Sequence, residues 1–121
     1  MFGFLRRRGS AIPRIDAAEA LTRVRAGTLT LIDVREAGEL RQTGRATGAL
    51  HIPVGSLLKL AHPESAECLP ALETCPPVAL YCASGARAEN AAKMMLQMGY
   101  TEVYTMVSLR YWQDAGGEIT A

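Results

Sequence analysis

The sequence predicts an α/β domain built on a parallel sheet, and three observations lead to that class. The chain has 121 residues, which fits one domain and leaves little room for two. Hydrophobic residues make up 49% and charged residues 21%, the balance of an ordinary globular protein with its own core. Short β-rich runs alternate with helical segments, as in folds whose helices connect parallel strands and cover both faces of the sheet.

The first predicted helix begins after Asp16, because its carboxylate can accept hydrogen bonds from the free amides of a first helical turn. Glu19, three residues later, is placed to complete a capping box. The apolar positions of this helix share one face: Ala17, Leu21 and Val24. Gly27 ends the helix, and the β-rich residues 29–33 predict a buried strand.

The middle of the chain predicts less regular structure. Residues 49–53 predict an extended stretch that ends at Pro53, which has no N–H to donate to a sheet. Ser56 stands where it can cap a short helix, whose apolar residues are Leu57, Leu58 and Leu60. Residues 62–77 contain four prolines and predict a connection with one helical turn over residues 68–72.

The second half of the chain has clearer signals. Residues 78–81 predict the most clearly buried strand, which runs directly into the turn 82–87. The helix after this turn has small or apolar residues on one face: Ala88, Ala91, Ala92 and Met95. Gly99 ends that helix, residues 101–106 predict the last strand, and residues 110–115 predict a short closing helix.

Charge is unevenly distributed along the chain. Lys and Arg number 13 against 12 Asp and Glu, a formal net charge of +1 that offers no electrostatic case for binding nucleic acid. Four arginines precede the first acidic residue and predict a basic, flexible leader over residues 1–14, followed by a single domain over residues 15–121. The alternative is a contact between this leader, through Phe2 and Phe4, and an anionic membrane or a partner.

Membrane insertion and secretion are not expected. No segment approaches the ~20 apolar residues that span a bilayer. The short apolar start precedes its arginines, whereas a secretory signal places charge first and a longer apolar run after it. We therefore expect a cytoplasmic protein with no transmembrane segment.

Cys82 is the candidate nucleophile, since it stands between a predicted strand and a predicted helix, where parallel sheets bind their ligands. Free amides and the helix dipole favour a thiolate there. Gly85 allows the positive φ that a curled loop needs, and Arg87 adds a permanent positive charge. Such a thiolate can attack without a histidine base. The alternative is a buried, inert thiol at the end of a strand.

The run Cys82-x-x-Gly85-x-Arg87-Ala88 resembles the active-site loop of rhodanese-like sulfurtransferases. The resemblance extends over about residues 15–117, and its other marks are residues 31–36, residues 48–53, Gly99-Tyr100 with Val103, and Trp112. It implies a five-stranded parallel sheet flanked by helices on both faces. It also implies that Cys82 takes a sulfane sulfur as a persulfide and passes it to an acceptor, without a cofactor or a metal.

The loop after the cysteine is the predicted binding cradle, formed by Ala83, Ser84, Gly85, Ala86 and Arg87. Its backbone amides would hold an anionic persulfide with the same donors that hold the thiolate. Four residues lie between Cys82 and Arg87, whereas cysteine phosphatases that resemble this fold have five and surround a tetrahedral phosphate. The shorter loop therefore predicts sulfur transfer rather than phosphoryl transfer.

The sequence departs from the family pattern at three places. Residues 44–48 lack the histidine that the family commonly carries there, and Ser108-Leu109 stands where a Gly-Gly pair is frequent. Arg87 is the only basic residue of the loop, whereas members that favour thiosulfate often have more. The first two differences are expected to reshape the pocket beside the loop and so to affect which acceptor it takes. The third leads to the hypothesis that the donor is a protein-bound persulfide, or another donor not identified by the sequence, rather than a small dianion.

Asp33 and Arg35 lie at the end of a predicted strand, on the same side by the two-residue period. We expect a structural role near the site for both. Arg35 is expected to pair with Glu36, Glu39 or another nearby carboxylate, and Asp33 to hold loop amides.

The other candidate residues predict packing rather than chemistry. His51 and His62 have no third ligand at metal spacing, so we expect no metal site. Cys68 and Cys75 form no Cys-x-x-Cys pair and are expected to be packed or surface thiols, with a resolving role for Cys82 as the alternative. The aromatic pair of the closing helix, Tyr111 and Trp112, is expected to cover the core, or else to line the pocket.

Two functions remain from the sequence. The first is an enzyme that transfers sulfur from a small donor such as thiosulfate to a thiol or cyanide. The second is a sulfur carrier or binding module, in which Cys82 passes sulfur to an acceptor protein with little small-molecule turnover. Neither involves nucleic acid.

Overall fold

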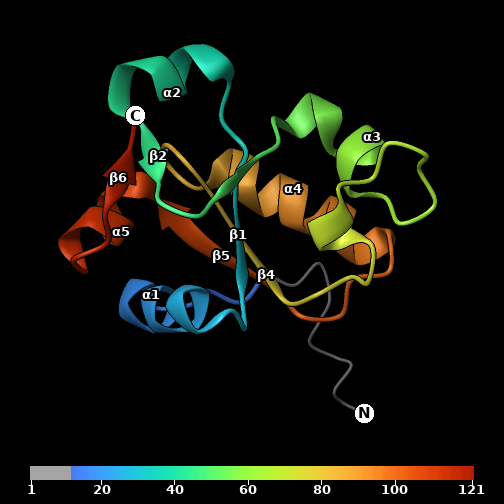
Figure 1. Cartoon of the computed structure of the whole chain (residues 1–121), viewed down its shortest axis with the longest axis horizontal. Coiled ribbons are helices and arrows are strands. Elements are labelled where there is room, and N and C mark those ends of the chain that lie inside the picture. The colour runs from blue at the N-terminus through green and yellow to red at the C-terminus, as the bar shows by residue number, and fades with distance from the viewer. Residues whose placement is uncertain (1–11) are drawn as a thin grey trace.

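The computed structural model describes residues 12–121 and contains a central parallel sheet of four strands. Its strands are β1 (Thr30–Asp33), β3 (Leu50–His51), β4 (Val78–Cys82) and β5 (Val103–Ser108). Their spatial order is β3-β1-β4-β5, and every neighbouring pair is parallel (Figure 1). All five residues of β4 are buried, as expected for an inner strand covered on both faces. The predicted α/β class is confirmed.

Helices cover both faces of this sheet, and each face has its own hydrophobic cluster. On one face lie α3 (Leu57–Ala61) and α4 (Ala86–Gln97), and on the other lie α1 (Ala17–Ala26) and α5 (Leu109–Asp114). Strand side chains alternate between the two clusters: Leu31 belongs to one and Ile32 to the other. Both faces of the inner strands are therefore covered by helices and shielded from solvent.

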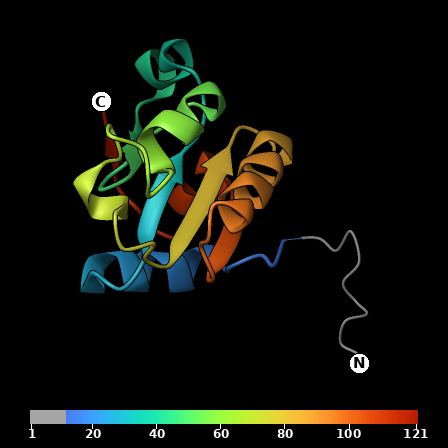
Figure 2. The same ribbon diagram turned by 90° about the vertical axis from the view of Figure 1, so that its right-hand side faces the viewer.

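A further helix, α2 (Ala37–Thr43), lies beyond the carboxyl ends of β1 and β4, at the top of Figure 2. None of its residues is buried, so its sequence shows no regular spacing of apolar residues. For this reason the helix was not predicted. Its start is held by a reciprocal capping box between Glu36 and Glu39. An antiparallel pair of two-residue strands, β2 (Arg45–Ala46) and β6 (Ile119–Thr120), was also not predicted, because two residues carry no readable alternation.

The sheet differs from the expected five strands, since it has four. In the fifth place, along the outer edge of β5, Arg14 forms a single parallel bridge with Thr105. The Ile15 N–H donates to the Thr105 carbonyl and the Thr105 N–H donates to the Pro13 carbonyl, each at 3.0 Å. The bridge does not extend into a strand because Pro13 has no N–H and Asp16 already caps α1.

The start of the packed chain lies earlier than residue 15, where the domain was expected to begin. Ile12 is buried in the cluster beneath α4, and Pro13 and Arg14 are tied to β5. Residues 12–14 therefore pack with the domain. The rest of the expected leader, residues 1–11, lies outside the described residues.

Most predicted helix boundaries are confirmed, but two predicted capping interactions are not formed: the return hydrogen bond from the Glu19 side chain at the start of α1, and the Ser56 cap of α3. The Asp16 carboxylate accepts hydrogen bonds from the N–H groups of Ala18 and Glu19, and Gly27 ends α1 with a left-handed φ of 78°. Ser56 precedes α3 as expected, but its side chain makes no capping hydrogen bond. The cap is not needed because the chain already turns through a 3-10 helix, Val54–Ser56, before α3 begins. No helix within residues 12–121 is long and apolar enough to cross a membrane.

Candidate active site

Cys82 is the last residue of β4, and its side chain is buried. Strand β4 lies between β1 and β5, and Ser108 of β5 stands opposite Cys82. The chain then turns sharply into α4, which begins after Gly85 at a φ of 111°. The thiol is thus held at the carboxyl edge of the sheet, at the start of a twelve-residue helix.

Two backbone amides point at the sulfur. The Gly85 N–H donates to Cys82 Sγ at 3.0 Å, and the Ala88 N–H donates to it at 3.4 Å. Such donors strengthen when the acceptor is an anion, so they stabilise a thiolate or a persulfide more than a neutral thiol. Ala88 lies one residue beyond the predicted cradle. Its amide is free to donate to the sulfur because it belongs to the first turn of α4, which begins at Ala86.

The residues of the predicted cradle differ in how far they are exposed. Ala83, Ser84 and Ala86 are exposed, while Gly85 and Arg87 are half-buried. The loop is therefore open to solvent on the side from which a donor or an acceptor would approach.

The charged group of Arg87 is occupied by a carboxylate from α2. Arg87 Nη1 donates to Glu39 Oε2 at 2.7 Å, and Nη2 donates to Oε1 at 2.9 Å. These hydrogen bonds lower the pKa of Glu39 to about 2 and raise the pKa of Arg87, with the proximity of Cys82 a smaller cause of the latter. This pair was not predicted from the sequence, where Glu39 was one of several possible partners of Arg35.

Arg35 instead pairs with Asp33, two residues earlier on its own chain segment. Its Nη2 donates to Asp33 Oδ2 at 2.8 Å and its Nε to Oδ1 at 3.0 Å, in a buried pair. The same guanidinium donates to Thr43 Oγ1 and to the Gly44 carbonyl, each at 2.9 Å. Of the expected partners, Glu36 and Glu39 do not pair with Arg35; the nearby carboxylate that does is Asp33, which the short turn brings within reach.

Asp33 holds a loop amide as predicted, accepting the Arg35 N–H at 3.0 Å. Its hydrogen bonds, together with those of Arg35, fix the turn from β1 into α2 and the end of that helix. Hydrogen bonding to Asp33 raises the pKa of Arg35. The pair therefore sets where α2 lies, and with it Glu39.

A strained residue stands beside the loop. Val107 has a φ of 77°, a left-handed conformation that a β-branched side chain rarely adopts. It lies at a register shift of β5 against β4, where Tyr81 pairs with Val107 and Met106 is skipped. A Cβ on Gly85 would lie 3.2 Å from Val107 Cγ1. Glycine is therefore needed at position 85 both for its backbone conformation and for space.

The residue with a left-handed backbone at this turn is thus Val107. It lies one residue before Ser108-Leu109, the pair at which the sequence departs from the family pattern. Ser108 caps α5 by accepting the Tyr111 N–H at 3.4 Å, and Leu109 begins the helix. These two residues serve the helix, and the side chain beside the loop is that of Val107.

Comparison with protein families shows which family the chain belongs to. A family model described as the rhodanese-like domain matches residues 16–113. The chain belongs to the rhodanese-like family. This family includes sulfurtransferases, and the resemblance drawn from the loop and its flanking motifs is confirmed.

Solved structures agree with the fold of this rhodanese-like domain. A protein from Rhodopseudomonas palustris, described as a possible tyrosine phosphatase, is 27% identical over 90% of this chain and 85% of its own, with a TM-score of 0.77. The human single-domain sulfurtransferase TSTD1 is 26% identical over 84% and 96%, with a TM-score of 0.69. A rhodanese-related protein from Thermoplasma volcanium is 25% identical over 89% and 97%, with a TM-score of 0.66.

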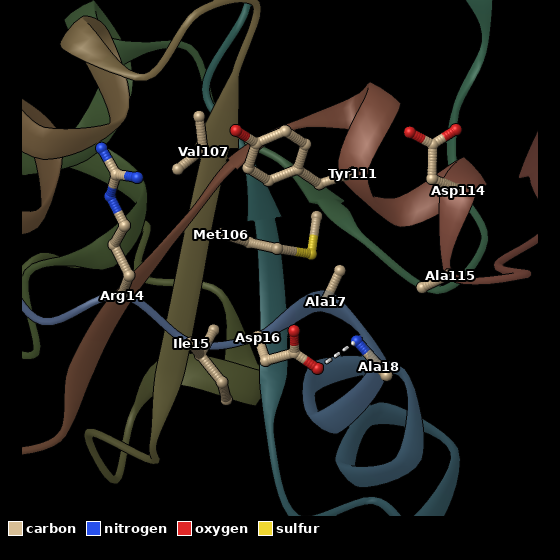
Figure 3. A pocket seen from close by; sticks show the side chains of 10 residues that line it. All are labelled: Arg14, Ile15, Asp16, Ala17, Ala18, Met106, Val107, Tyr111, Asp114 and Ala115. Carbon is tan, nitrogen blue, oxygen red and sulfur yellow. Dashed lines mark hydrogen bonds between the residues drawn. The ribbon is translucent and has the colours of Figure 1, made fainter.

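A cavity of about 490 Å³ lies on the other side of Val107, between the end of β5 and the first turns of α1 (Figure 3). Met106 points into it, and Tyr111 lies across it from α5. Tyr111 thus lines a pocket of this rhodanese-like domain, whereas Trp112 is buried in the core and donates to the Glu118 carbonyl at 2.7 Å.

The remaining cysteines and histidines of this rhodanese-like domain make local contacts. Cys68 is buried, which raises its pKa, and its thiol donates to the Leu69 carbonyl at 3.6 Å. Cys75 is half-buried against the same cluster. His51 Nε2 lies 2.7 Å from the Arg35 carbonyl, and His62 Nδ1 accepts the Glu64 N–H. Within the part of the chain that the structure describes, no group of three or more His, Cys, Asp or Glu is arranged to hold a metal ion.

Proposed function

We propose that this rhodanese-like domain is a sulfurtransferase that carries a sulfane sulfur on Cys82. The observation that carries the proposal is the pair of amides, from Gly85 and Ala88, that donate to Cys82 Sγ. They provide the stabilisation that a nucleophilic thiolate and its persulfide need. The name of TSTD1, a single-domain sulfurtransferase that shares 26% of its residues with this chain, supports the same reaction class.

The reaction divides into two displacements at sulfur. The Cys82 thiolate attacks the sulfane sulfur of a donor such as thiosulfate, the donor's S–S bond breaks, and sulfite leaves with the electron pair. A thiolate or cyanide acceptor then attacks the outer sulfur of the persulfide, and Cys82 leaves as the thiolate. Both steps begin and end with negative charge on sulfur at the loop, so preorganised amides stabilise every charged state. An acceptor protein would enter at the second step.

Intact-mass measurement tests this proposal. We expect wild-type protein incubated with thiosulfate, or with glutathione hydropersulfide, to gain the mass of one sulfur atom and to lose it on addition of cyanide. The Cys82→Ser variant should gain none, while the matched Cys68→Ser control should behave as wild type. Absence of the added mass in wild type with both donors would refute sulfur transfer. A persulfide that forms but is released slowly by cyanide or dithiothreitol would favour the carrier alternative.

Phosphatase activity is the competing function, because the similar protein from Rhodopseudomonas palustris is described as a possible tyrosine phosphatase. Two observations weigh against it in this chain. The loop has four residues between Cys82 and Arg87, and the Arg87 guanidinium is already bound by Glu39. We expect no turnover of an aryl phosphate, and turnover that Cys82→Ser abolishes would reverse this conclusion.

A further inference from the structure

We propose that Glu39 sets the donor preference of the Cys82 site: by neutralising Arg87 it selects hydropersulfides, in which the transferred sulfur is protonated, over dianionic thiosulfate. The inference rests on the proposed sulfur transfer at Cys82 and goes further by naming the donor class and the residue that selects it. Glu39 acts here through Arg87 and is therefore a positioning residue.

The geometry ties Glu39 firmly to Arg87. Both carboxylate oxygens accept from the guanidinium, at 2.7 and 2.9 Å, and Oε2 also accepts the Glu36 N–H at 2.9 Å. The Glu39 side chain is 35% exposed and that of Arg87 is 40% exposed. A donor in solution therefore meets an ion pair already formed, held by the capping box of α2, rather than an available guanidinium.

The surroundings do not replace the neutralised charge. Arg87 is the only cationic residue of the loop 82–87. Asp33 and Arg35 form a closed, buried pair. Glu89, in the first turn of α4, adds a negative charge, and its partner Lys93 lies 3.9 Å away. Within residues 12–121, the groups that donate to Cys82 Sγ are the Gly85 and Ala88 amides, whereas the charge of the nearby Arg87 is offset by Glu39.

The two donor classes place different charge beside this pair. With a hydropersulfide, the Cys82 thiolate attacks the outer sulfur of R–S–SH, the S–S bond breaks, and R–S⁻ leaves with the electron pair; the proton stays on the transferred sulfur. With thiosulfate, the dianion enters and sulfite leaves with two negative charges. Coulomb repulsion from an anionic group grows in proportion to the donor's charge, so Glu39 opposes thiosulfate more strongly.

The Glu39→Gln variant tests the proposal, because glutamine keeps the size of the side chain and can still accept the Glu36 N–H. We expect kcat/KM for thiosulfate to rise about tenfold, mainly through a lower KM, at a site where solvent screens part of the Coulomb energy. For glutathione hydropersulfide, kcat/KM should change by less than about threefold. Loss of activity with both donors equally would indicate a merely structural role and overturn the proposal.

Glu36→Gln is the matched control, since it removes a charge of the same sign from the same capping box at a side chain that does not itself pair with Arg87. It should leave the ratio of the two kcat/KM values unchanged, and an equal effect in this variant would overturn the proposal. Arg87→Gln is an independent test that does not depend on the first variant folding. It leaves Glu39 unpaired, so activity with thiosulfate should fall further than activity with the hydropersulfide; an equal fall contradicts the proposal.

Failure of this inference is distinguishable from failure of the proposed function. If wild type acquires sulfur from neither donor by intact mass, sulfur transfer itself is wrong. If it acquires sulfur from both while the kcat/KM ratio does not respond to Glu39→Gln, sulfur transfer stands and the selective role of Glu39 is wrong.

Discussion

Gly85 shows how one residue connects backbone conformation to chemistry. Its φ of 111° starts α4, its N–H donates to Cys82 Sγ, and its missing side chain leaves room for Val107. The same loop cannot be made by a residue with a Cβ without moving one of these three. The opposing Val107 carries its own strained φ of 77°, as backbone strain near functional sites often does.

Gly85→Ala should therefore lower the free energy of unfolding by about 1–3 kcal/mol and slow persulfide formation, because φ is strained and the new Cβ meets Val107. Urea denaturation and intact mass after a brief donor pulse measure the two effects. Gly55→Ala is the control, since nothing lies within 4 Å of a Cβ there, and it should change stability by less than about 0.5 kcal/mol. Equal effects of both substitutions would contradict this account.

Glu39 also gives stability a pH dependence. Its pKa falls to about 2 in the folded chain, below the ordinary value of 4.5, so its contribution is fully present above that ordinary value. The contribution is lost as the pH falls from there toward about 2. Because the pair is partly exposed, we expect it to contribute less than about 1 kcal/mol.

The measurement is the difference in unfolding free energy between wild type and Glu39→Gln, from urea titrations at neutral pH and near about pH 3. The difference should shrink at the lower pH, because Glu39 then takes up a proton in the unfolded chain while it stays mostly ionised in the folded chain, so acidification favours unfolding of wild type. A difference that grows on acidification would show that the carboxylate is not stabilised by Arg87.

Among the elements, those with a buried face could be predicted and those without one could not. The strands β1, β4 and β5 and the helices α1 and α4 follow from apolar periodicity, capping residues and glycine stops. α2 packs no residue into the core and is held by polar contacts, so no hydrophobic pattern marks it. Without α2, no pattern in the sequence places Glu39 beside Arg87.

The start of α1 offers a test at this scale. Asp16→Ala removes the carboxylate that accepts from Ala18 and Glu19, and should lower the free energy of unfolding by about 1 kcal/mol in thermal or urea denaturation. Asp114→Ala is the matched control, because that carboxylate lies on the surface of α5 with only an exposed partner, Arg110, at 3.6 Å. It should change stability by less than about 0.5 kcal/mol. The reverse ranking would show that the cap contributes nothing.

At the scale of the whole molecule, the fold class and the place of Cys82 could be predicted because they follow from local pattern and a strand-to-helix turn. The partnership of Glu39 and Arg87 joins residues 48 positions apart. The sheet has four strands rather than five because Pro13 and the Asp16 cap of α1 keep the segment beside β5 from forming a strand. Long-range pairings of this kind leave no periodic signal, so they required the structure.

The buried pair of Asp33 and Arg35 connects several parts of the molecule, because Arg35 also contacts Thr43 and Gly44 at the end of α2, and its carbonyl lies 2.7 Å from His51 Nε2 of β3. Arg35→Leu would leave the Asp33 carboxylate buried without its partner. We expect a loss of about 3 kcal/mol in the free energy of unfolding by urea denaturation.

Arg41→Leu, an exposed position on α2, is the control for Arg35→Leu and should change stability by less than about 0.5 kcal/mol. The double variant Asp33→Ala/Arg35→Leu should lose less than the sum of its single variants, because it removes both buried charges. Strict additivity would show that the two side chains do not depend on one another.

The bridge between Arg14 and Thr105 has a consequence for how these molecules behave in a crowded solution. β5 is an edge strand, and an unpaired edge is a template on which a strand of another molecule can add. The Pro13 carbonyl accepts the outward N–H of Thr105, and the Ile15 N–H donates to the outward Thr105 carbonyl. The proline ring has no N–H that could continue the ladder. Residues 13–15 thus protect the middle of this edge, at Thr105, from pairing with a strand of another molecule.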